Sequence, residues 1–314
     1  MIHQEERTLP ITGPILVTGA TGTQGGATID ALLDAGMPVR ALVRDPASAA
    51  ARKLSERGVT LCAGDFDDTV LLDKAVEGVF GVFSMQLTPL PGDPDSEVRT
   101  GRKLIEAARR AGVVQFVHTS VARAGDQASF AGWSEGRWTK GYWDSKSAVN
   151  SLVRVAGFDH WTVLKPAFMM ENFIPPKAVW MFPLLASGLL GTAMTKGVPL
   201  DLISAADVGR FAAAAFMDPS RFDRQEIDLA AETLDMDSLA AVIADATGKP
   251  VQARYLTEVE AIDTGHHAGL VSSQQWASIE GYKVDLARAA SFGIRLETFA
   301  AWAQQHRDDF VVNV

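Results

Sequence analysis

A tyrosine and a lysine lie four residues apart in the segment Tyr142-Trp-Asp-Ser-Lys146. If this segment is helical, the spacing places both side chains on one face of the helix. A phenol with an ordinary pKa of about 10 is a poor acid or base at neutral pH, and a neighbouring ammonium lowers that pKa. Hydride transfer to a carbonyl or quinone requires a proton source, so Tyr142 is a candidate acid/base tuned by Lys146. The alternative is an aromatic side chain on a cleft wall beside a solvated lysine.

A glycine-rich segment follows the first apolar run of the chain. The β-rich run at residues 14–18 leads into Gly19-Ala-Thr-Gly22-Thr-Gln-Gly25, and a helical pattern begins there. In such a motif the first glycine permits a tight turn, the second lets a pyrophosphate approach the backbone, and the third lets the helix pack close to the strand. The N–H groups at the helix N-terminus then receive the phosphates. The segment predicts a dinucleotide-binding loop, and the alternative is an ordinary strand–helix turn.

The residues at the end of the second predicted strand indicate whether the cofactor is NADP or NAD. Residues 39–43 are followed by Arg44 and Asp45. An arginine at this place accommodates the 2′-phosphate of NADP, whereas an acidic residue binds the ribose 2′-hydroxyl of NAD. Because Arg44 comes first, and Arg52 and Lys53 add positive charge nearby, the sequence favours NADP(H) over NAD(H). In the alternative, Arg44 only solvates the loop and Asp45 binds the ribose.

An acidic motif, Gly64-Asp65-Phe66-Asp67-Asp68, follows the third predicted strand. Asp65 can accept a hydrogen bond from an adenine amino group, with the Phe66 ring against the base. A helix N-cap by Asp67 explains the motif equally well and is compatible with the first role. The candidate cofactor contacts of the whole chain are Gly19, Thr21, Gly22, Gln24, Gly25, Arg44, Asp65, Phe66, Ser84, Lys146 and Phe168.

Strand and helix patterns alternate through the first half of the chain. This alternation predicts an α/β fold with a doubly wound parallel Rossmann sheet. The strands are expected at residues 14–18, 39–43, 59–62, 79–84, 113–119 and 161–165, and the helices at 24–35, 47–57, 69–76, 97–111 and 142–156.

The alternation of strand and helix patterns becomes less regular after Pro166, where two further helices are expected at residues 205–217 and 236–247. We therefore predict a smaller C-terminal lobe built on the edge of the sheet. The expected domains are an N-terminal arm at residues 1–12, a NAD(P)-binding Rossmann domain at 13–166 and a substrate-binding lobe at 167–314.

Composition excludes several classes of protein. Of the 314 residues, 47% are hydrophobic and 21% are charged, as in a globular protein. The net charge of −9, without a basic run, argues against a nucleic-acid partner. Cys62 is the only cysteine, so no disulfide can form within the chain, and a reducing, cytoplasmic location is expected.

Two further segments bear on metal binding and membrane binding. His266 and His267 have no carboxylate cluster beside them, so they predict solvated or pocket-lining histidines and no metal site. Residues 178–194 carry no charge, but Pro183 and two glycines interrupt them. They predict a buried or lid-like element, not a membrane span.

The motifs taken together resemble those of the NmrA-like atypical short-chain dehydrogenases. The resemblance covers nearly the whole chain, and it implies a nucleotide-binding Rossmann fold. That family includes NAD(P)H-dependent reductases of quinones, dyes and plant phenylpropanoids, and also nucleotide-sensing regulators with no known turnover. The motifs are Gly-Ala-Thr-Gly-x-Gln-Gly at residues 19–25, Val-Arg-Ala-Leu-Val-Arg at 39–44, Gly-Asp-x-Asp-Asp at 64–68, and the segments 165–173, 206–209, 276–282 and 298–302.

The resemblance also implies roles for the Tyr142–Lys146 pair. Short-chain dehydrogenases use a Tyr-x-x-x-Lys pair, in which Lys146 would also hold the nicotinamide ribose hydroxyls. Many NmrA-like members keep the lysine and lack the tyrosine, so Tyr142 favours turnover. The third member of the usual set, a serine just past the fifth strand, aligns with Val121. Ser120 or Thr119 substitutes for it if the turn differs.

Apolar and aromatic side chains follow the sixth predicted strand, where ligands bind in doubly wound folds. A wall of this composition suits a flat, hydrophobic aromatic substrate, and packing of the lobe core explains it as well. The residues are Phe168, Met169, Met170, Phe173, Trp180, Met181, Phe182, Leu184 and Leu185, with Trp133, Trp138 and Trp143 on the other side.

Three functions remain open from the sequence. The first is an NADP(H)-dependent reductase of a hydrophobic aromatic carbonyl, quinone or related compound, with Tyr142 as acid/base and Lys146 orienting the cofactor and Tyr142. The second is a redox sensor that binds NADP(H) and signals through a partner protein; Tyr142 argues against it and Val121 argues for it. The third is a tailoring enzyme of aromatic natural products that uses the same site.

Overall fold

The computed structural model describes residues 12–314, so the predicted N-terminal arm lies outside the described residues except for its last residue. The chain divides into two compact units, each made of several segments. Unit 1 comprises Met1–Val121, Asp144–Lys165 and Val208–Ile227, and unit 2 comprises Ala122–Trp143, Pro166–Asp207 and Asp228–Val314. The assignment of domains at residues 13–166 and 167–314 stays a prediction.

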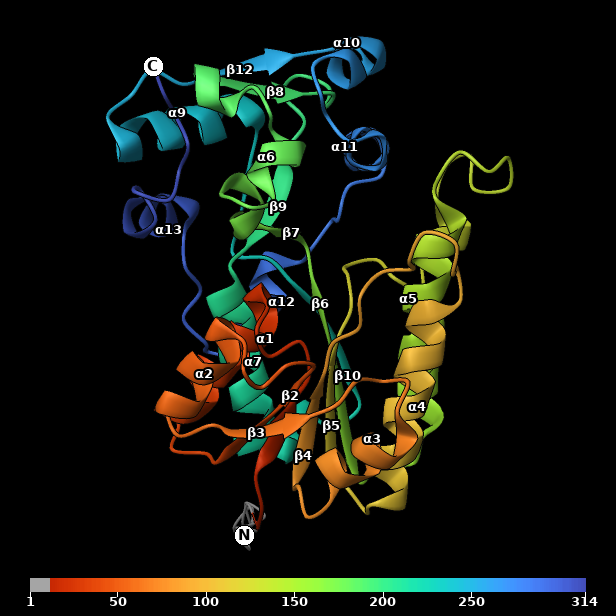
Figure 1. The fold of residues 1–314 in the computed structure, drawn as a ribbon. Coiled ribbons are helices and arrows are strands. Elements are labelled where there is room, and N and C mark those ends of the chain that lie inside the picture. Colours follow the sequence, from red (N-terminus) through yellow and green to blue (C-terminus); the bar gives the residue numbers. More distant parts are fainter. Residues whose placement is uncertain (1–11) are drawn as a thin grey trace, which may run out of the picture. The chain divides into compact units, whose positions relative to one another are not determined.

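Seven strands form the central sheet of unit 1 (Figure 1). They are β1 (Ile15–Val17), β2 (Val39–Val43), β3 (Thr60–Ala63), β4 (Gly81–Ser84), β5 (Gln115–Thr119), β6 (His160–Pro166) and β10 (Gln225–Leu229). Their order is β10-β6-β5-β4-β1-β2-β3, and parallel pairings join the neighbours from β6 to β3. This is the strand order of dinucleotide-binding folds, in which the winding direction reverses between β1 and β4. The predicted α/β fold with a doubly wound parallel sheet is confirmed.

Helices cover both faces of this sheet. They are α1 (Thr23–Asp34), α2 (Ala49–Glu56), α3 (Thr69–Val76), α4 (Ser96–Arg110), α5 (Lys140–Val155), α7 (Ala205–Met217) and α8 (Pro219–Phe222). Figure 1 shows α3, α4 and α5 on one face and α1, α2 and α7 on the other. Phe116 of β5 packs with Leu104 of α4 and Val153 of α5, whereas its neighbour Gln115 donates a hydrogen bond to the Ala215 carbonyl of α7. Successive side chains of a strand thus serve opposite faces.

Unit 2 contains shorter elements. One sheet has the order β11-β9-β7, and a separate parallel pair joins β12 to β8. Stacked aromatic rings fill its core: the Phe173 and Phe182 centroids are 4.8 Å apart, and those of Phe299 and Trp302 are 5.6 Å apart. The strands are β7 (Phe168–Met169), β8 (Leu189–Thr192), β9 (Leu200–Ile203), β11 (Glu232–Leu234) and β12 (Gln252–Tyr255). The helices are α6 (Ala178–Met181), α9 (Met236–Thr247), α10 (Glu258–Asp263), α11 (Ala268–Ile279), α12 (Leu286–Ser291) and α13 (Phe299–Gln305).

The charge-free residues 178–194 form no long helix. They divide into α6, a short 3-10 turn at Leu185–Ser187 and β8, and Gly188 between the last two adopts a left-handed conformation with φ of 76°. Within residues 12–314, no helix has the length and apolar character needed to cross a bilayer.

Candidate functional site

The loop between β1 and α1 has the backbone geometry of a phosphate-binding turn. Gly19 adopts φ of 63°, and its carbonyl accepts a hydrogen bond of 2.9 Å from the Gly22 N–H. A Cβ at Gly25 would lie 2.2 Å from the Gly19 oxygen, so only glycine fits at that position. A Cβ at Gly22 would meet that oxygen at 3.2 Å and nothing else within 4 Å. The Gly22 backbone therefore faces open space.

The N-terminus of α1 is free to bind an anion. No side chain caps it, and its first turn contains no acidic residue. The first N–H groups of a helix have no partner within the helix, and they carry the positive end of its dipole. By contrast, α2 is capped by Ser48 and α3 by Asp68. The exposed, uncapped start of α1 at Gly22 therefore fits a phosphate group of a dinucleotide.

The end of β5 supports this loop. The Thr119 hydroxyl donates a 2.7 Å hydrogen bond to the Gln24 side-chain oxygen, so Thr119 holds the first turn of α1. Ser120 is only 7% exposed, and its hydroxyl has no hydrogen-bond partner among residues 12–314. Val121 is buried and apolar. Of the two candidates for the missing serine, Ser120 keeps its hydroxyl available, whereas Thr119 does not.

Two charged residues follow β2 and differ in their contacts. The Asp45 carboxylate accepts a 2.8 Å hydrogen bond from the Ala47 N–H, which closes its own turn. The Arg44 side chain is exposed and makes no hydrogen bond or ion pair within the described part of the chain. Arg52 donates to the Ala47 carbonyl. Arg44 and Asp45 are both exposed, and of the two only Arg44 has no hydrogen bond or ion pair with a described residue.

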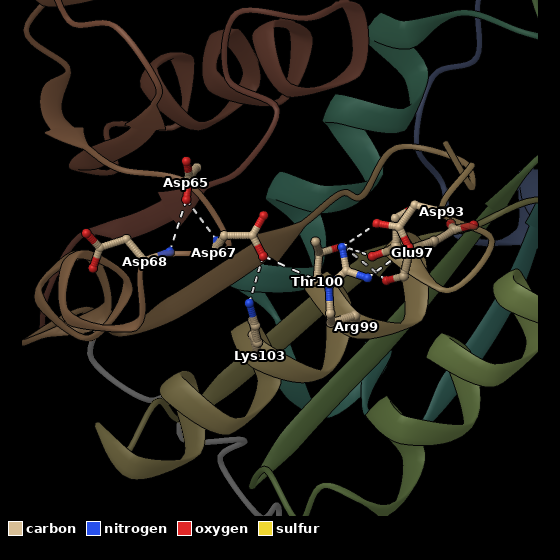
Figure 2. Close-up of polar contacts among 9 residues, drawn as sticks. Asp65, Asp67, Asp68, Asp93, Glu97, Arg99, Thr100 and Lys103 are labelled. Carbon is tan, nitrogen blue, oxygen red and sulfur yellow. Dashed lines mark hydrogen bonds and ion pairs between the residues drawn. The ribbon is translucent and has the colours of Figure 1, made fainter. Parts of the chain in front are cut away.

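The acidic loop after β3 is shown in Figure 2. Asp65 Oδ1 accepts hydrogen bonds from the Asp67 and Asp68 N–H groups, at 2.8 and 3.0 Å. Asp68 caps α3, and Asp67 instead forms an ion pair with Lys103 of α4 at 2.7 Å. The predicted N-cap at Asp67 is therefore wrong by one residue, because the turn around Asp65 directs Asp67 toward α4. Asp65 Oδ2 accepts no hydrogen bond from the described residues.

Lys146 forms a buried ion pair in unit 1. Its ammonium lies 2.6 Å from Oε1 of Glu97, a residue of α4 that is also drawn in Figure 2. The Ser145 hydroxyl donates to Oε2 of the same carboxylate, also at 2.6 Å. Glu97 is 1% exposed and Lys146 is 7% exposed. The Glu97 carboxylate therefore fixes the position of Lys146. Glu97 was not among the site residues predicted from the sequence.

His118 lies in the same buried polar region. Its Nδ1 atom is 3.1 Å from the Ser84 carbonyl and 3.3 Å from the Ser84 hydroxyl, which also accepts a hydrogen bond from Gln86. Burial, and then the positive charge of Lys146, lower the pKa of His118 from 6.5 to about 3. His118 is therefore neutral at physiological pH. Ser84, a candidate cofactor contact, is 1% exposed and bonds to these neighbours.

Tyr142 is one turn before Lys146 in α5 and belongs to an aromatic cluster of unit 2. Its ring centroid is 5.3 Å from that of Trp143, which is 4.6 Å from Trp276, and Trp276 is 5.0 Å from Tyr282. Trp143 and Trp276 are 5% and 3% exposed. Trp143 therefore packs in the interior, and Tyr142 lies partly exposed at the end of the cluster.

The predicted apolar wall is divided between a pocket and the core of unit 2. Phe168 and Phe182 line a pocket of about 300 Å³, a volume that includes its opening to solvent. Met170 and Phe173 are fully buried, whereas Trp180 is 45% exposed and its ring contacts His267. Phe168, a predicted cofactor contact, thus lines a pocket within unit 2.

The two adjacent histidines have structural roles. His266 is 3% exposed, and its ring nitrogens lie 3.0 Å from the Ala261 carbonyl and 3.1 Å from the Gly191 carbonyl. His267 caps α11 by accepting a hydrogen bond from the Gly269 N–H. The expectation that both are solvated or line a pocket is wrong for His266, which joins the end of α10 to β8. No group of three potential metal ligands occurs in residues 12–314.

Comparisons with known proteins extend these observations. The model of the NmrA-like family matches residues 12–291. The chain is 31% identical over 239 residues to the NAD(P)H azoreductase of Xenophilus azovorans, an alignment that covers 76% of this chain and 75% of that protein.

Solved structures share the fold. The NADPH-dependent quinone oxidoreductase QOR2 of Escherichia coli, complexed with NADPH, matches with a TM-score of 0.73 and 22% identity, over 93% of this chain and 99% of that one. NmrA, a negative transcriptional regulator in complex with NAD, matches with a TM-score of 0.75 and 19% identity, over 94% and 95% of the two chains. Because the family model spans nearly all of the described residues, this chain belongs to the NmrA-like family.

Proposed function

We propose that this protein is an NAD(P)H-dependent oxidoreductase that acts on hydrophobic aromatic, quinone-like or carbonyl substrates, and that it prefers NADP(H). The observation that carries the proposal is the exposed, uncapped N-terminus of α1 at Gly22, beside the switch point of a doubly wound sheet. The similarity to an NAD(P)H azoreductase supports a redox reaction on an aromatic compound. The quinone oxidoreductase with the same fold supports the same cofactor class.

The contacts after β2 support the proposed preference for NADP(H). A 2′-phosphate needs a cation, and the exposed Arg44 provides one that is not engaged by another described residue. The ribose 2′-hydroxyl of NAD needs an acceptor, and the Asp45 carboxylate is held in its own turn by the hydrogen bond from the Ala47 N–H to Oδ1. The proposed cofactor site therefore has Gly19, Gly22 and Gly25 at the phosphates and Arg44 at the 2′-phosphate. Asp65 Oδ2 is left to accept from the adenine.

The proposed catalytic residues lie on α5. NAD(P)H held at this site would supply the hydride, and the Tyr142 hydroxyl would supply the proton that the reduced oxygen requires. Lys146 orients the site, Glu97 orients Lys146, and the Ser145 hydroxyl orients Glu97. His118, neutral and buried, is not the acid at neutral pH. Ser120, one residue before the usual position of the serine at Val121, has an available hydroxyl.

Turnover is favoured over the other two hypotheses. A sensor needs the dinucleotide but not a proton donor, and the chain has Tyr142 at the place of the proton donor. The azoreductase relative is named as an enzyme. No described feature points to a partner protein or to a natural-product substrate.

Steady-state kinetics with a quinone substrate tests the assignment of Tyr142. Tyr142→Phe keeps the ring and its contact with Trp143, so NADPH affinity should barely change. Loss of the proton donor should lower kcat by about a hundredfold or more. If Tyr142→Phe turned over at the normal rate, the hydroxyl would not be the proton source.

A further inference from the structure

The segment that leads into α5 is irregular but partly buried. Residues 122–139, in unit 2, precede α5, the helix that carries Tyr142, and they contain no α-helix or strand. Phe130 and Trp138 of this segment are nevertheless only 3% and 4% exposed. Because buried backbone groups need hydrogen-bond partners, such a segment depends on contacts with other elements. The contacts that hold it therefore also fix where α5 begins.

Two hydrogen bonds connect Glu280 to the start of α5. Glu280 follows α11 directly and is 8% exposed, and its Oε1 accepts a 2.7 Å hydrogen bond from the Ala131 N–H. The Ala131 carbonyl in turn accepts a 2.8 Å hydrogen bond from the indole N–H of Trp138. Trp138 lies two residues before α5, and the carbonyl of the next residue, Thr139, accepts the Tyr142 N–H at 3.1 Å. Both backbone groups of Ala131 are thus engaged, and Glu280 is the outer end of this chain of contacts.

Arg123 holds the same segment from its other end. Its backbone adopts φ of 67°, a left-handed conformation that is uncommon for residues other than glycine. The guanidinium donates hydrogen bonds of 3.1 Å to the Asp126 carboxylate and to the Gly281 carbonyl. It also lies 3.9 Å from Glu280 Oε2, and its Cζ is 4.9 Å from the ring centroid of Phe130. Such backbone conformations persist where surrounding contacts enforce them, and they cluster at functional sites.

Aromatic packing links the held segment to Tyr142. The Phe130 ring meets Trp143 edge-on at a centroid distance of 5.0 Å, and it lies 5.5 Å from Trp276. Trp143 follows Tyr142 in α5, and the two rings meet edge-on at 5.3 Å. Because closely packed side chains transmit displacement, a shift of the segment at Phe130 would move Trp143 and with it the Tyr142 ring.

We propose that Glu280 is a positioning residue for Tyr142, and that it acts through its hydrogen bond to the Ala131 N–H. The inference rests on the proposed function for the role of Tyr142 as proton donor, and it adds the residue that fixes where the phenol lies. The proposed cofactor contacts Gly22 and Arg44 belong to unit 1, whereas Glu280 and Tyr142 belong to unit 2. Loss of the hydrogen bond should therefore impair the chemical step and spare cofactor binding.

Fluorine NMR of the full chain labelled with 3-fluorotyrosine reports the surroundings of Tyr142 without a substrate. The chain has three tyrosines, so Tyr142→Phe assigns the resonance, and Tyr255 on β12 is an internal reference. Glu280→Leu removes the acceptor at similar size and should shift or broaden the Tyr142 resonance but not that of Tyr255. Glu280→Gln keeps an oxygen for the Ala131 N–H and should retain the native resonance.

Trp138→Phe breaks the second hydrogen bond of the chain and should act like Glu280→Leu. It provides an independent test if Glu280→Leu does not fold, as judged by circular dichroism. An unchanged Tyr142 resonance in either variant, once folded, would overturn the inference.

Steady-state kinetics with NADPH and a quinone separates positioning from a general structural role. Glu280→Leu should lower kcat about tenfold to a hundredfold, the cost of misplacing a reacting group, and leave NADPH affinity unchanged. In the Tyr142→Phe background the same substitution should have little further effect, because the hydroxyl that Glu280 positions is gone. Equal losses in the two backgrounds, or a Glu280→Gln variant as impaired as Glu280→Leu, would overturn the inference. A displaced Tyr142 resonance in Glu280→Leu, without quinone reduction by the unchanged protein, would leave the placement of Tyr142 by Glu280 standing and remove the proposed function.

Discussion

Replacing Glu97 by glutamine tests how much the negative charge of Glu97, paired with buried Lys146, contributes to the stability of the fold. The substitution keeps the size of the side chain and an oxygen for the Ser145 hydroxyl, but it removes the carboxylate from the buried Lys146 ammonium. Breaking a buried ion pair by removing one partner costs about 3–5 kcal/mol. We therefore expect Glu97→Gln to lose about 3–5 kcal/mol of stability at pH 7.

Urea unfolding followed by circular dichroism measures this loss. The double variant Glu97→Gln/Lys146→Met is the control. It removes both charges, and it should be more stable than Glu97→Gln alone. A loss below about 1 kcal/mol for Glu97→Gln would refute the reasoning that a buried ion pair positions Lys146.

Three further predictions concern the cofactor site and His118. Arg44→Ala should weaken NADPH binding and leave NADH binding unchanged in a fluorescence titration; equal affinities for the two cofactors in the unchanged protein would contradict the NADP(H) preference. Gly22→Ala should lower dinucleotide affinity with little loss of stability, because its Cβ meets only one protein atom, at 3.2 Å, whereas Gly25→Ala should disrupt the loop itself. Thermal unfolding, measured alongside the binding titration, distinguishes a loss of affinity in Gly22→Ala from a loss of stability in Gly25→Ala. The His118 ring should show no protonation by NMR down to about pH 5, because its pKa is about 3. The unfolded chain protonates His118 below about pH 6.5, so acidification should destabilise the fold. A His118 pKa measured near 6.5 in the folded protein would show that the ring is not buried beside Lys146.

Regular elements with strong local signals were predictable from the sequence. The helices at Thr69–Val76, Ala205–Met217 and Met236–Thr247, and the strand at Val39–Val43, occupy the residues expected for them. Local periodicity and a glycine after the last turn, as at Gly248, mark such elements.

Elements that depend on distant partners were not predictable. The strand β10 at Gln225–Leu229 has a weak pattern, and it forms because it pairs with β6 at the edge of the sheet. The strands of unit 2 are two to four residues long, too short for a periodic signal.

The candidate site also contains both features that the local sequence defines and features that depend on distant partners. The glycine loop and Arg44 could be recognised because neighbouring residues define them. The burial of Glu97 could not, because Glu97 meets Lys146 only when α4 and α5 pack on the same face of the sheet. The cap of α3 moved from Asp67 to Asp68 for a local reason, since the Asp65 carboxylate folds the preceding turn onto itself.

The central claim is that the chain transfers hydride from NAD(P)H to an aromatic, quinone-like acceptor. Absorbance at 340 nm, followed with NADPH and a panel of quinones, aromatic ketones and azo dyes, tests it most directly. We predict substrate-dependent loss of NADPH, matched one for one by reduced product of a quinone, and slower loss with NADH. Tight NADPH binding with no oxidation by any member of the panel would contradict the account.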